Sequence, residues 1–434
     1  MNRGKRQKPR RRWTWYLFLA ALFALGLSFG ISLSHRITAK PEASAQPSQT
    51  VPAPDDPVSP EPSGDPVSSE PPREEPPPAV SDTPSETPPP KPLSPAQETL
   101  AGMSLREKVC QMFVVLPSGP TGEEAVTQAG ESTRSALEQY PVGGMLYDAS
   151  NMVSQEQVRE MLAAAQSYSR IPLILTCDEE GGRVARLMGT VGTTKIGPML
   201  DYAHLGPEAA AANARIIAED MAALGFNTNL APVADVWSNP ENTVIGDRAY
   251  SRDFDQAAQL IPAAVEGFHA GGVACVLKHF PGHGDTSEDS HTGAAYVNKT
   301  LDQLWEEELQ PFRAGISAGA DMVMVGHLTV PAVDSEPAVF SHALVTELLR
   351  EELGFDGVVI TDSLRMKAVT DFCSSAEAAV KAVQAGVDLL LSPENLGEAV
   401  DGLLDAVERG EISLARIDES VLRILELKEA WGLL

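Results

Sequence analysis

Short apolar runs alternate with amphipathic stretches from about residue 97 to the end of the chain. The apolar runs predict eight buried strands, at residues 112–116, 143–147, 172–177, 228–234, 272–277, 321–326, 357–361 and 387–391. The stretches between them have helical spacing, as in residues 154–169 and 207–225. Near-continuous apolar strands, each followed by a helix, predict a (β/α)8 TIM-type barrel.

An open doubly wound sheet is the alternative architecture. We do not expect such a sheet to place functional residues after so many successive strands. No G-x-G-x-x-G or G-x-x-x-x-G-K motif follows any of the predicted strands. The pattern therefore favours the barrel.

The N-terminal part has a different texture. Residues 1–12 are strongly basic, and we expect them to stay in the cytoplasm. Residues 13–33 carry no charge and are long enough to cross a bilayer, which takes about 20 residues. This predicts a single-pass signal-anchor in the cell membrane with the remainder of the chain outside. Secretion after cleavage at Ala43–Ala45 is the alternative, and both readings export the C-terminal part.

A proline-rich segment separates the predicted anchor from the globular part. Residues 41–92 hold 18 prolines among Ser, Thr, Glu and Asp. Such a composition cannot bury a core, so residues 34–96 are predicted to be a disordered linker and residues 97–434 the folded domain. Residues 93–434 carry 22 basic and 50 acidic residues, a net charge of −28, which argues against nucleic acid as a partner.

Four cysteines occur along the chain, at Cys110, Cys177, Cys275 and Cys373. Three of them lie in or beside apolar runs, and no C-x-x-C spacing occurs. An extracellular location would permit disulfides. The contexts nevertheless predict small buried core residues rather than a disulfide framework.

Polar side chains follow five of the predicted strands. The carboxyl ends of barrel strands form one face, so these residues should converge there. They are Asp178, Glu179, Glu180, Arg183 and Arg186 after the third strand, Asp235 with Asp247 and Arg248 after the fourth, Lys278 and His279 after the fifth, His327 after the sixth, and Asp362 after the seventh.

Two kinds of chemistry could use this set. In the first, histidines and carboxylates bind a metal ion, with the candidate ligands His279, His283, Asp285, Asp289 and His291. The spacing of His279 and His283 would align them on a helix, but the Pro281, Gly282 and Gly284 around them make a helix improbable. The spacing therefore argues against a metal site.

Glycoside hydrolysis is the second possibility. A retaining glycosidase needs a carboxylate nucleophile and an acid for the leaving oxygen. Asp362 suits the nucleophile, and His291 suits the acid/base, oriented by Asp289 two residues before it. Sugar hydroxyls and an acyl group would then be held by Asp178, Arg186, Arg248, Lys278 and His279.

Four segments carry a specific resemblance: CDEEGGRVAR, IGDRAY, KHFPGHGDTSEDSHTG and ITDSLRM. They resemble the signature segments of family-three glycoside hydrolases, most of all the single-domain β-N-acetylglucosaminidase (β-N-acetylhexosaminidase) branch. The resemblance covers residues 97–434 and implies a barrel and a retaining mechanism. It maps the nucleophile onto Asp362, the acid/base onto His291 and its partner onto Asp289. It maps sugar binding onto Asp178, Arg186, Arg248, Lys278 and His279.

Some residues have other expected roles. Arg365 stands where the resemblance leads us to expect a small or polar residue, which bears on aglycone preference. We expect Arg183 to pair with Glu180, Asp247 to pair with Arg248, and His283 to shape its loop. His327 is either a hydrogen-bonded wall residue or a ligand contact.

The sequence thus predicts removal of non-reducing terminal β-linked N-acetylglucosamine from peptidoglycan fragments or related glycans. No cofactor and no metal is expected. The partners are the glycan and, through residues 13–33, the membrane. Phosphorolysis at the same site is one alternative, since a histidine acid/base lacks the charge that would repel phosphate. An inactive, surface-displayed glycan-binding module is the other.

Overall fold

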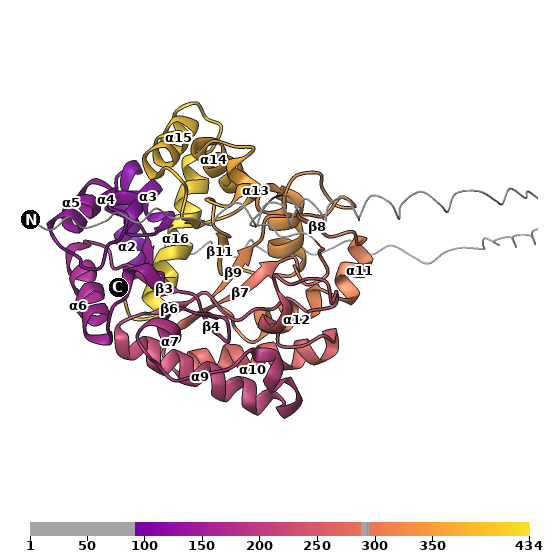
Figure 1. Ribbon diagram of the computed structural model, residues 1–434. Helices are drawn as coiled ribbons and strands as arrows, with labels where there is room; N and C mark the ends of the chain where they lie inside the picture. The colour runs from indigo at the N-terminus through magenta and orange to yellow at the C-terminus, as the bar shows by residue number, and fades with distance from the viewer. Residues whose placement is uncertain (1–91, 288–292, 294) are drawn as a thin grey trace, which may run out of the picture. The chain divides into compact units, whose positions relative to one another are not determined.

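A computed structural model describes residues 92–287, 293 and 295–434, which are drawn in colour in Figure 1. They belong to one compact unit, Thr87–Leu434. Over this part of the chain, no helix has both the length and the apolar character that a membrane span requires. The predicted anchor at residues 13–33 and most of the predicted linker lie outside the described residues, so both stay predictions.

Eight parallel strands form the centre of the unit. Each overlaps one of the predicted apolar runs. They are β1 (Phe113–Val115), β2 (Gly144–Leu146), β3 (Ile174–Cys177), β6 (Thr228–Asn229), β7 (Ala274–Phe280), β9 (Met322–Val325), β11 (Val358–Thr361) and β12 (Leu390–Leu391).

The strands are neighbours in sequence order. The sheet runs β11-β9-β7-β6-β3-β2-β1-β12, and a further parallel bridge between Ile360 and Leu389 brings its two edge strands together. The sheet is therefore a nearly closed parallel barrel, consistent with the TIM-type fold. A doubly wound sheet would not have this consecutive order.

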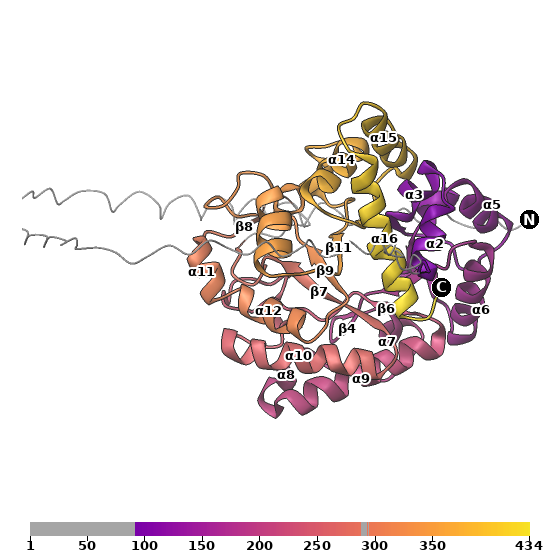
Figure 2. The ribbon, with the colours of Figure 1, turned by 180° about the vertical axis from the view of Figure 1, so that it is seen from behind.

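Helices surround the barrel (Figures 1 and 2). The longer ones are α5 (Glu131–Gln139), α6 (Gln155–Tyr168), α9 (Pro207–Leu224), α10 (Phe254–Ala270), α12 (Leu309–Ser317), η5 (Ala343–Glu352), α14 (Ser375–Ala385), α15 (Leu396–Glu408) and α16 (Leu414–Ala430).

Shorter elements lie at the start of the unit and in the loops. They are α2 (Pro95–Ala101), α3 (Leu105–Gln111), α4 (Ser118–Thr121), η1 (Ala149–Asn151), β4 (Glu179–Gly181), β5 (Val184–Ala185), α7 (Arg186–Thr190), α8 (Met199–Tyr202), η2 (Ala203–Leu205), η3 (Gly246–Arg248), β8 (Ala295–Tyr296), α11 (Leu301–Glu306), β10 (Leu328–Thr329), η4 (Ala338–Phe340) and α13 (Lys367–Thr370).

The neighbouring helices α9 and α10 show how local sequence sets the packing. Asp253 caps α10, where its side chain accepts a hydrogen bond from the backbone N–H of Gln256. The two helices lie side by side in Figures 1 and 2. Gly267 permits this approach, because a Cβ there would lie 2.3 Å from the carbonyl oxygen of Ala211.

The core fills the barrel and the space between strands and helices. Every residue of β1, β3, β7, β9 and β11 is buried, as expected for parallel strands covered on both faces. Cys110, Cys177 and Cys275 are buried, Cys373 is half-buried, and all four are free thiols. The prediction of small buried core residues is confirmed for Cys110, Cys177 and Cys275.

The ends of the folded unit pack together. Helix α2 lies against α16, and the backbone N–H of Ala96 donates to the Glu429 carboxylate over 3.1 Å. Lys428, on α16, is fully buried and donates to Oε1 of Gln111 over 2.8 Å. Burial lowers the pKa of Lys428 to about 7.

Candidate active site

A cavity of about 570 Å³ opens at the carboxyl ends of the strands. Six predicted site residues line it together: Asp178, Arg186, Arg248, Lys278, His279 and Asp362. Asp289 and His291, the predicted acid/base pair, lie outside the described residues. The structure therefore brings together all of the predicted site residues that it describes.

Lys278 is the most deeply buried charge in this cavity. Its side chain is 2% exposed, and Nζ lies 2.7 Å from Oδ1 of Asp178 and 2.7 Å from Oε1 of Glu180. Burial by itself would lower the pKa of Lys278, but the two carboxylates outweigh it and the pKa is raised. Lys278 is therefore held as a cation against the cavity wall.

Arg248 holds the other side of Glu180. Its Nε donates to Oε2 over 2.8 Å and its Nη2 to Oε1 over 2.8 Å, which makes a bidentate pair. Burial would raise the pKa of Glu180, but Lys278 and Arg248 hold it well below its usual range. Glu180 is thus an anion that fixes two cations at the cavity.

Asp178 and Arg186 stand nearer the opening. Nη2 of Arg186 lies 3.8 Å from Oδ2 of Asp178, and the two side chains are 36% and 25% exposed. Arg186 is the first residue of α7, whose N-terminus is held by Glu179. The Glu179 carboxylate accepts the backbone N–H groups of Leu187 and Met188 over 2.7 and 3.0 Å. A partly exposed carboxylate beside a partly exposed guanidinium can both accept from and donate to a sugar.

His279 is oriented by a buried carboxylate. Its Nδ1 lies 2.7 Å from Oδ2 of Asp235, and its backbone N–H donates to Oδ1 over 3.1 Å. Burial would raise the pKa of Asp235, but His279 lowers it below the usual value. Asp235 accepts the Nδ1 proton of His279, so Nε2 is the nitrogen that remains for a ligand.

Asp362 directly follows β11. Its backbone N–H donates to the carbonyl of Val325 on β9 over 2.9 Å, which fixes the residue at the strand end. Its Oδ1 accepts the backbone N–H of Ser363 over 2.7 Å. Ser363 also lines the cavity, and its carbonyl lies 2.9 Å from Nε2 of His327. His327 is therefore a hydrogen-bonded wall residue behind Asp362.

Two expected ion pairs are wrong, because the partners are exchanged. Arg183 does not pair with Glu180. Its Nε donates to Oδ1 of Asp247 over 3.0 Å, and its Nη2 donates to the carbonyls of residues 243–245. Arg248 takes Glu180 instead. The reason is depth: Glu180 is 3% exposed and meets the buried Arg248, whereas Arg183 and Asp247 are 45% and 40% exposed.

Two residues that matter to the site were not predicted to contact its sugar-binding residues. Glu180 joins Lys278 to Arg248, and Asp235 orients His279. The available signal was their position: each is an acidic residue at a predicted strand end, in the same group as the predicted sugar ligands. Local sequence could not say which cations they would meet.

The proposed metal ligands do not converge among the described residues. His279 engages Asp235, and Nδ1 of His283 lies 2.8 Å from Oγ1 of Thr286. The carbonyl of His283 accepts from Nδ2 of Asn242 over 2.7 Å. His283 is buried, and burial lowers its pKa. It therefore shapes the start of its loop, as expected.

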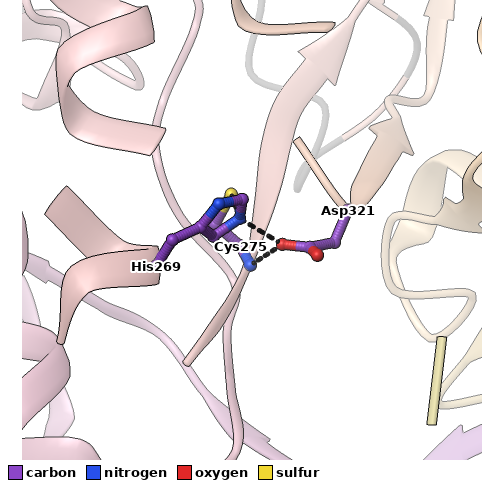
Figure 3. Close-up of side chains that lie close together, drawn as sticks. All are labelled: His269, Cys275 and Asp321. Atoms are coloured by element: carbon purple, nitrogen blue, oxygen red, sulfur yellow. Dashed lines mark hydrogen bonds and ion pairs between the residues drawn. The ribbon is translucent and has the colours of Figure 1, made fainter. Parts of the chain in front are cut away.

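One other cluster has metal-ligand character within the described parts of the chain (Figure 3). It lies at the opposite ends of the strands. His269 Nε2 and the backbone N–H of Cys275 lie 2.8 and 2.9 Å from Oδ2 of Asp321. Nε1 of Trp431 donates to Oδ1 of Asp321 over 2.8 Å. These bonds tie the C-terminal segment to the amino ends of the strands, and they use both carboxylate oxygens of Asp321.

Known proteins are similar to this chain in sequence and in fold. The Glycosyl hydrolase family 3 N terminal domain matches residues 104–427. The chain belongs to glycosyl hydrolase family 3. The family expected from the four signature segments is thereby confirmed.

The relatives agree on the branch. Beta-hexosaminidase A of Pseudoalteromonas piscicida is 35% identical over 71% of this chain and 57% of its own length. A beta-hexosaminidase of Stenotrophomonas maltophilia is 36% identical over 68% of this chain and 88% of its own length. A family 3 beta-N-acetylglucosaminidase from Paenibacillus sp. has a solved structure that superposes with a TM-score of 0.72, at 40% identity, over 76% of this chain and 63% of that one. The chain spans less than two thirds of the length of the Pseudoalteromonas and Paenibacillus proteins.

Proposed function

We propose that this family 3 protein is a retaining β-N-acetylglucosaminidase. It would remove non-reducing terminal N-acetylglucosamine from peptidoglycan fragments or related glycans. The observation that carries the proposal is one cavity lined by Asp362 together with the five residues predicted to bind the sugar. The names of the similar proteins support the choice of sugar.

The proposed reaction has two steps. In the first, an Asp362 oxygen attacks the anomeric carbon while His291 gives its proton to the leaving oxygen, so the glycosidic bond breaks and a glycosyl ester forms. In the second, His291 takes a proton from water, whose oxygen attacks the same carbon and releases Asp362. Asp289 would orient His291 and stabilise its protonated ring.

Substrate binding would use the charged wall. Lys278 and Arg248 are fixed donors whose positions are set by Glu180, and Asp178 is an acceptor near the opening. A terminal sugar presents hydroxyls that both donate and accept, which such a mixed wall can satisfy. His279 would offer Nε2, with its orientation set by Asp235.

The test is product analysis with the purified protein. With 4-nitrophenyl N-acetyl-β-glucosaminide, nuclear magnetic resonance should show the β-anomer of free N-acetylglucosamine as the first product. Asp362→Ala should abolish turnover while the circular dichroism spectrum stays unchanged. Near-native hydrolysis by that variant, or an α-anomer formed first, would refute the mechanism.

The same assay separates the rivals. In phosphate buffer, a phosphorylase would release the sugar 1-phosphate, whereas the proposed hydrolase releases the free sugar. An inactive binding module would bind N-acetylated glycans without turnover.

We also propose that residues 13–33 hold the protein in the cell membrane with the catalytic domain outside. The uncharged run and its basic flank carry this proposal. The full chain should sediment with membranes and be accessible to external protease, and a chain lacking residues 1–33 should do neither. A full-length chain that is released into the medium would contradict the anchor.

A further inference from the structure

The cluster at the amino ends of the strands combines three kinds of metal-ligand atom (Figure 3). His269 lies in the last turn of α10, Cys275 is the second residue of β7, and Asp321 directly precedes β9. Their imidazole nitrogen, thiol sulfur and carboxylate oxygen all lie within 4.8 Å of one another. None of the three lines the active-site cavity. The cluster is therefore separate from the residues that the sequence offered as metal ligands.

The separations of these atoms are close to those around a tetrahedral zinc ion. Zinc binds sulfur at about 2.3 Å and nitrogen at about 2.1 Å, which places the two ligand atoms about 3.6 Å apart. Sγ of Cys275 lies 3.7 Å from Nε2 of His269. Nε2 of His269 lies 2.8 Å from Oδ2 of Asp321, so the imidazole has to move outward by about 0.6 Å to admit the ion. The His269 side chain is 30% exposed, which leaves room for this movement.

The carboxylate of Asp321 is already oriented for such a role. Its Oδ2 accepts the backbone N–H of Cys275 over 2.9 Å, and its Oδ1 accepts Nε1–H of Trp431 over 2.8 Å. A carboxylate offers about four lone-pair positions. Oδ2 can therefore keep the Cys275 N–H and bind an ion once Nε2 of His269 turns from this oxygen to the metal. Hydrogen bonds from neighbouring groups commonly fix metal-binding carboxylates in this way.

The Cys275 thiol is the ligand that must lose a proton. The residue is fully buried, and burial raises the pKa of its thiol well above the ordinary value. A bound cation reverses this, because its charge stabilises the thiolate and the thiol proton leaves to solvent. The His269 and Asp321 side chains are 30% and 13% exposed, so an ion can enter from their side. A water molecule can take the fourth position there.

We infer that His269, Cys275 and Asp321 form a zinc site at the amino ends of the strands. Thiolate, imidazole and carboxylate together suit zinc, whereas calcium and magnesium prefer oxygen ligands. The ion links the end of α10 to β7 and to the start of β9, and through Asp321 to Trp431 near the C-terminus. Asp362 lies at the opposite ends of the strands. Zinc here therefore stabilises the fold and takes no part in the hydrolysis.

The test uses the full-length protein after chelation, with cobalt(II) as a spectroscopic substitute for zinc. Cobalt takes the same ligands more weakly, and its bond to a thiolate gives a charge-transfer band in the near ultraviolet. Titration of the wild type should produce this band with one ion per chain, and zinc should remove the band by displacing cobalt. Zinc should also raise the Tm of the wild type, because it binds the folded chain.

Variants assign the band to the cluster. Cys275→Ala should lack the band, and His269→Gln should raise the dissociation constant for zinc by at least about tenfold. Cys110→Ala is the matched control: it removes another buried free thiol, on α3, and should keep both the band and the rise in Tm. His269→Gln alters a partly exposed side chain, so it decides the question even if Cys275→Ala does not fold.

Three results would overturn the inference. The first is a wild type that gives no charge-transfer band with cobalt. The second is a band that persists in Cys275→Ala or is lost equally in Cys110→Ala. The third is a His269→Gln protein that binds zinc as tightly as the wild type does.

Discussion

Replacing Glu180 by glutamine removes the anion that lies between Lys278 and Arg248. In the wild type the Glu180 carboxylate receives three charge-assisted hydrogen bonds, of 2.7, 2.8 and 2.8 Å, with its side chain 3% exposed. Glutamine keeps one acceptor oxygen but presents an N–H₂ group to at least one of these donors. Two buried cations then lose their shared partner.

The size of the effect follows from burial. Removing one member of a buried ion pair costs about 3–5 kcal/mol, because the remaining charge stays buried without compensation. Unfolding entropy is about 2.1 cal/mol/K per residue, so over Thr87–Leu434 this loss lowers Tm by about 5 °C. We also expect KM to rise, since Lys278 and Arg248 are no longer fixed toward the sugar.

The pH dependence gives a second readout. The folded pKa of Glu180 lies below its ordinary value of 4.5. The stability that Glu180 contributes is therefore present above pH 4.5 and is lost as the pH falls further. The difference in Tm between wild type and Glu180→Gln should shrink at acidic pH.

The assay is thermal unfolding followed by circular dichroism, at neutral and acidic pH, together with hydrolysis kinetics. Glu160→Gln is the matched control, because Glu160 is exposed on α6 and its replacement should leave Tm unchanged. A Glu180→Gln protein with the Tm and KM of the control would refute the role of this ion network.

Three further predictions concern other parts of the molecule. Asp235→Asn should lower kcat/KM by about ten- to a hundredfold through loss of the His279 orientation, and a folded variant with wild-type kinetics would refute this. In the wild type, the free energy of unfolding should rise by about 2 kcal/mol between pH 7 and pH 9, because the unfolded lysine keeps its proton over this range and the buried Lys428 does not. Denaturant titration should show that this rise is absent from Lys428→Met. An equal rise in both proteins would show that Lys428 is protonated when folded. Exhaustive chelation should leave hydrolysis unchanged, and activity that is lost and then restored by zinc would revive the metal mechanism.

The strands were predictable because parallel strands that are covered on both faces have continuous apolar sequences. The first and last residues of two strands were harder to predict. The run at residues 228–234 forms a strand only at Thr228–Asn229, with one isolated bridge from Val233 to Lys278, and it contains Pro232, which has no N–H to donate. Strand β7 continues through Lys278 and His279, where the charges suggested a loop. Ion pairs from distant segments make their burial possible, and no local pattern reports that.

The site residues were predictable as a group, since strand-end position brings them to one face. Their pairings were not. Arg183 lies close to Glu180 in one signature segment, and Arg248 follows Asp247 in another. Local sequence does not say how deeply each side chain is buried, so it cannot assign the pairs. The degree of burial decides the pairing: the less exposed Arg248 pairs with Glu180, and the more exposed Arg183 pairs with Asp247. The same holds for Asp235, whose role depends on the contact of two strand ends that are distant in sequence.

Trapping the glycosyl-enzyme tests the central claim most directly. A 5-fluoro N-acetyl-β-glucosaminyl fluoride should form its ester faster than water removes it. Intact mass spectrometry should then show one added sugar per chain, and peptide mapping should place it on Asp362 in ITDSLRM, with no addition to Asp362→Ala. A label on another residue, or rapid turnover of unmodified substrate without any covalent intermediate, would contradict the account.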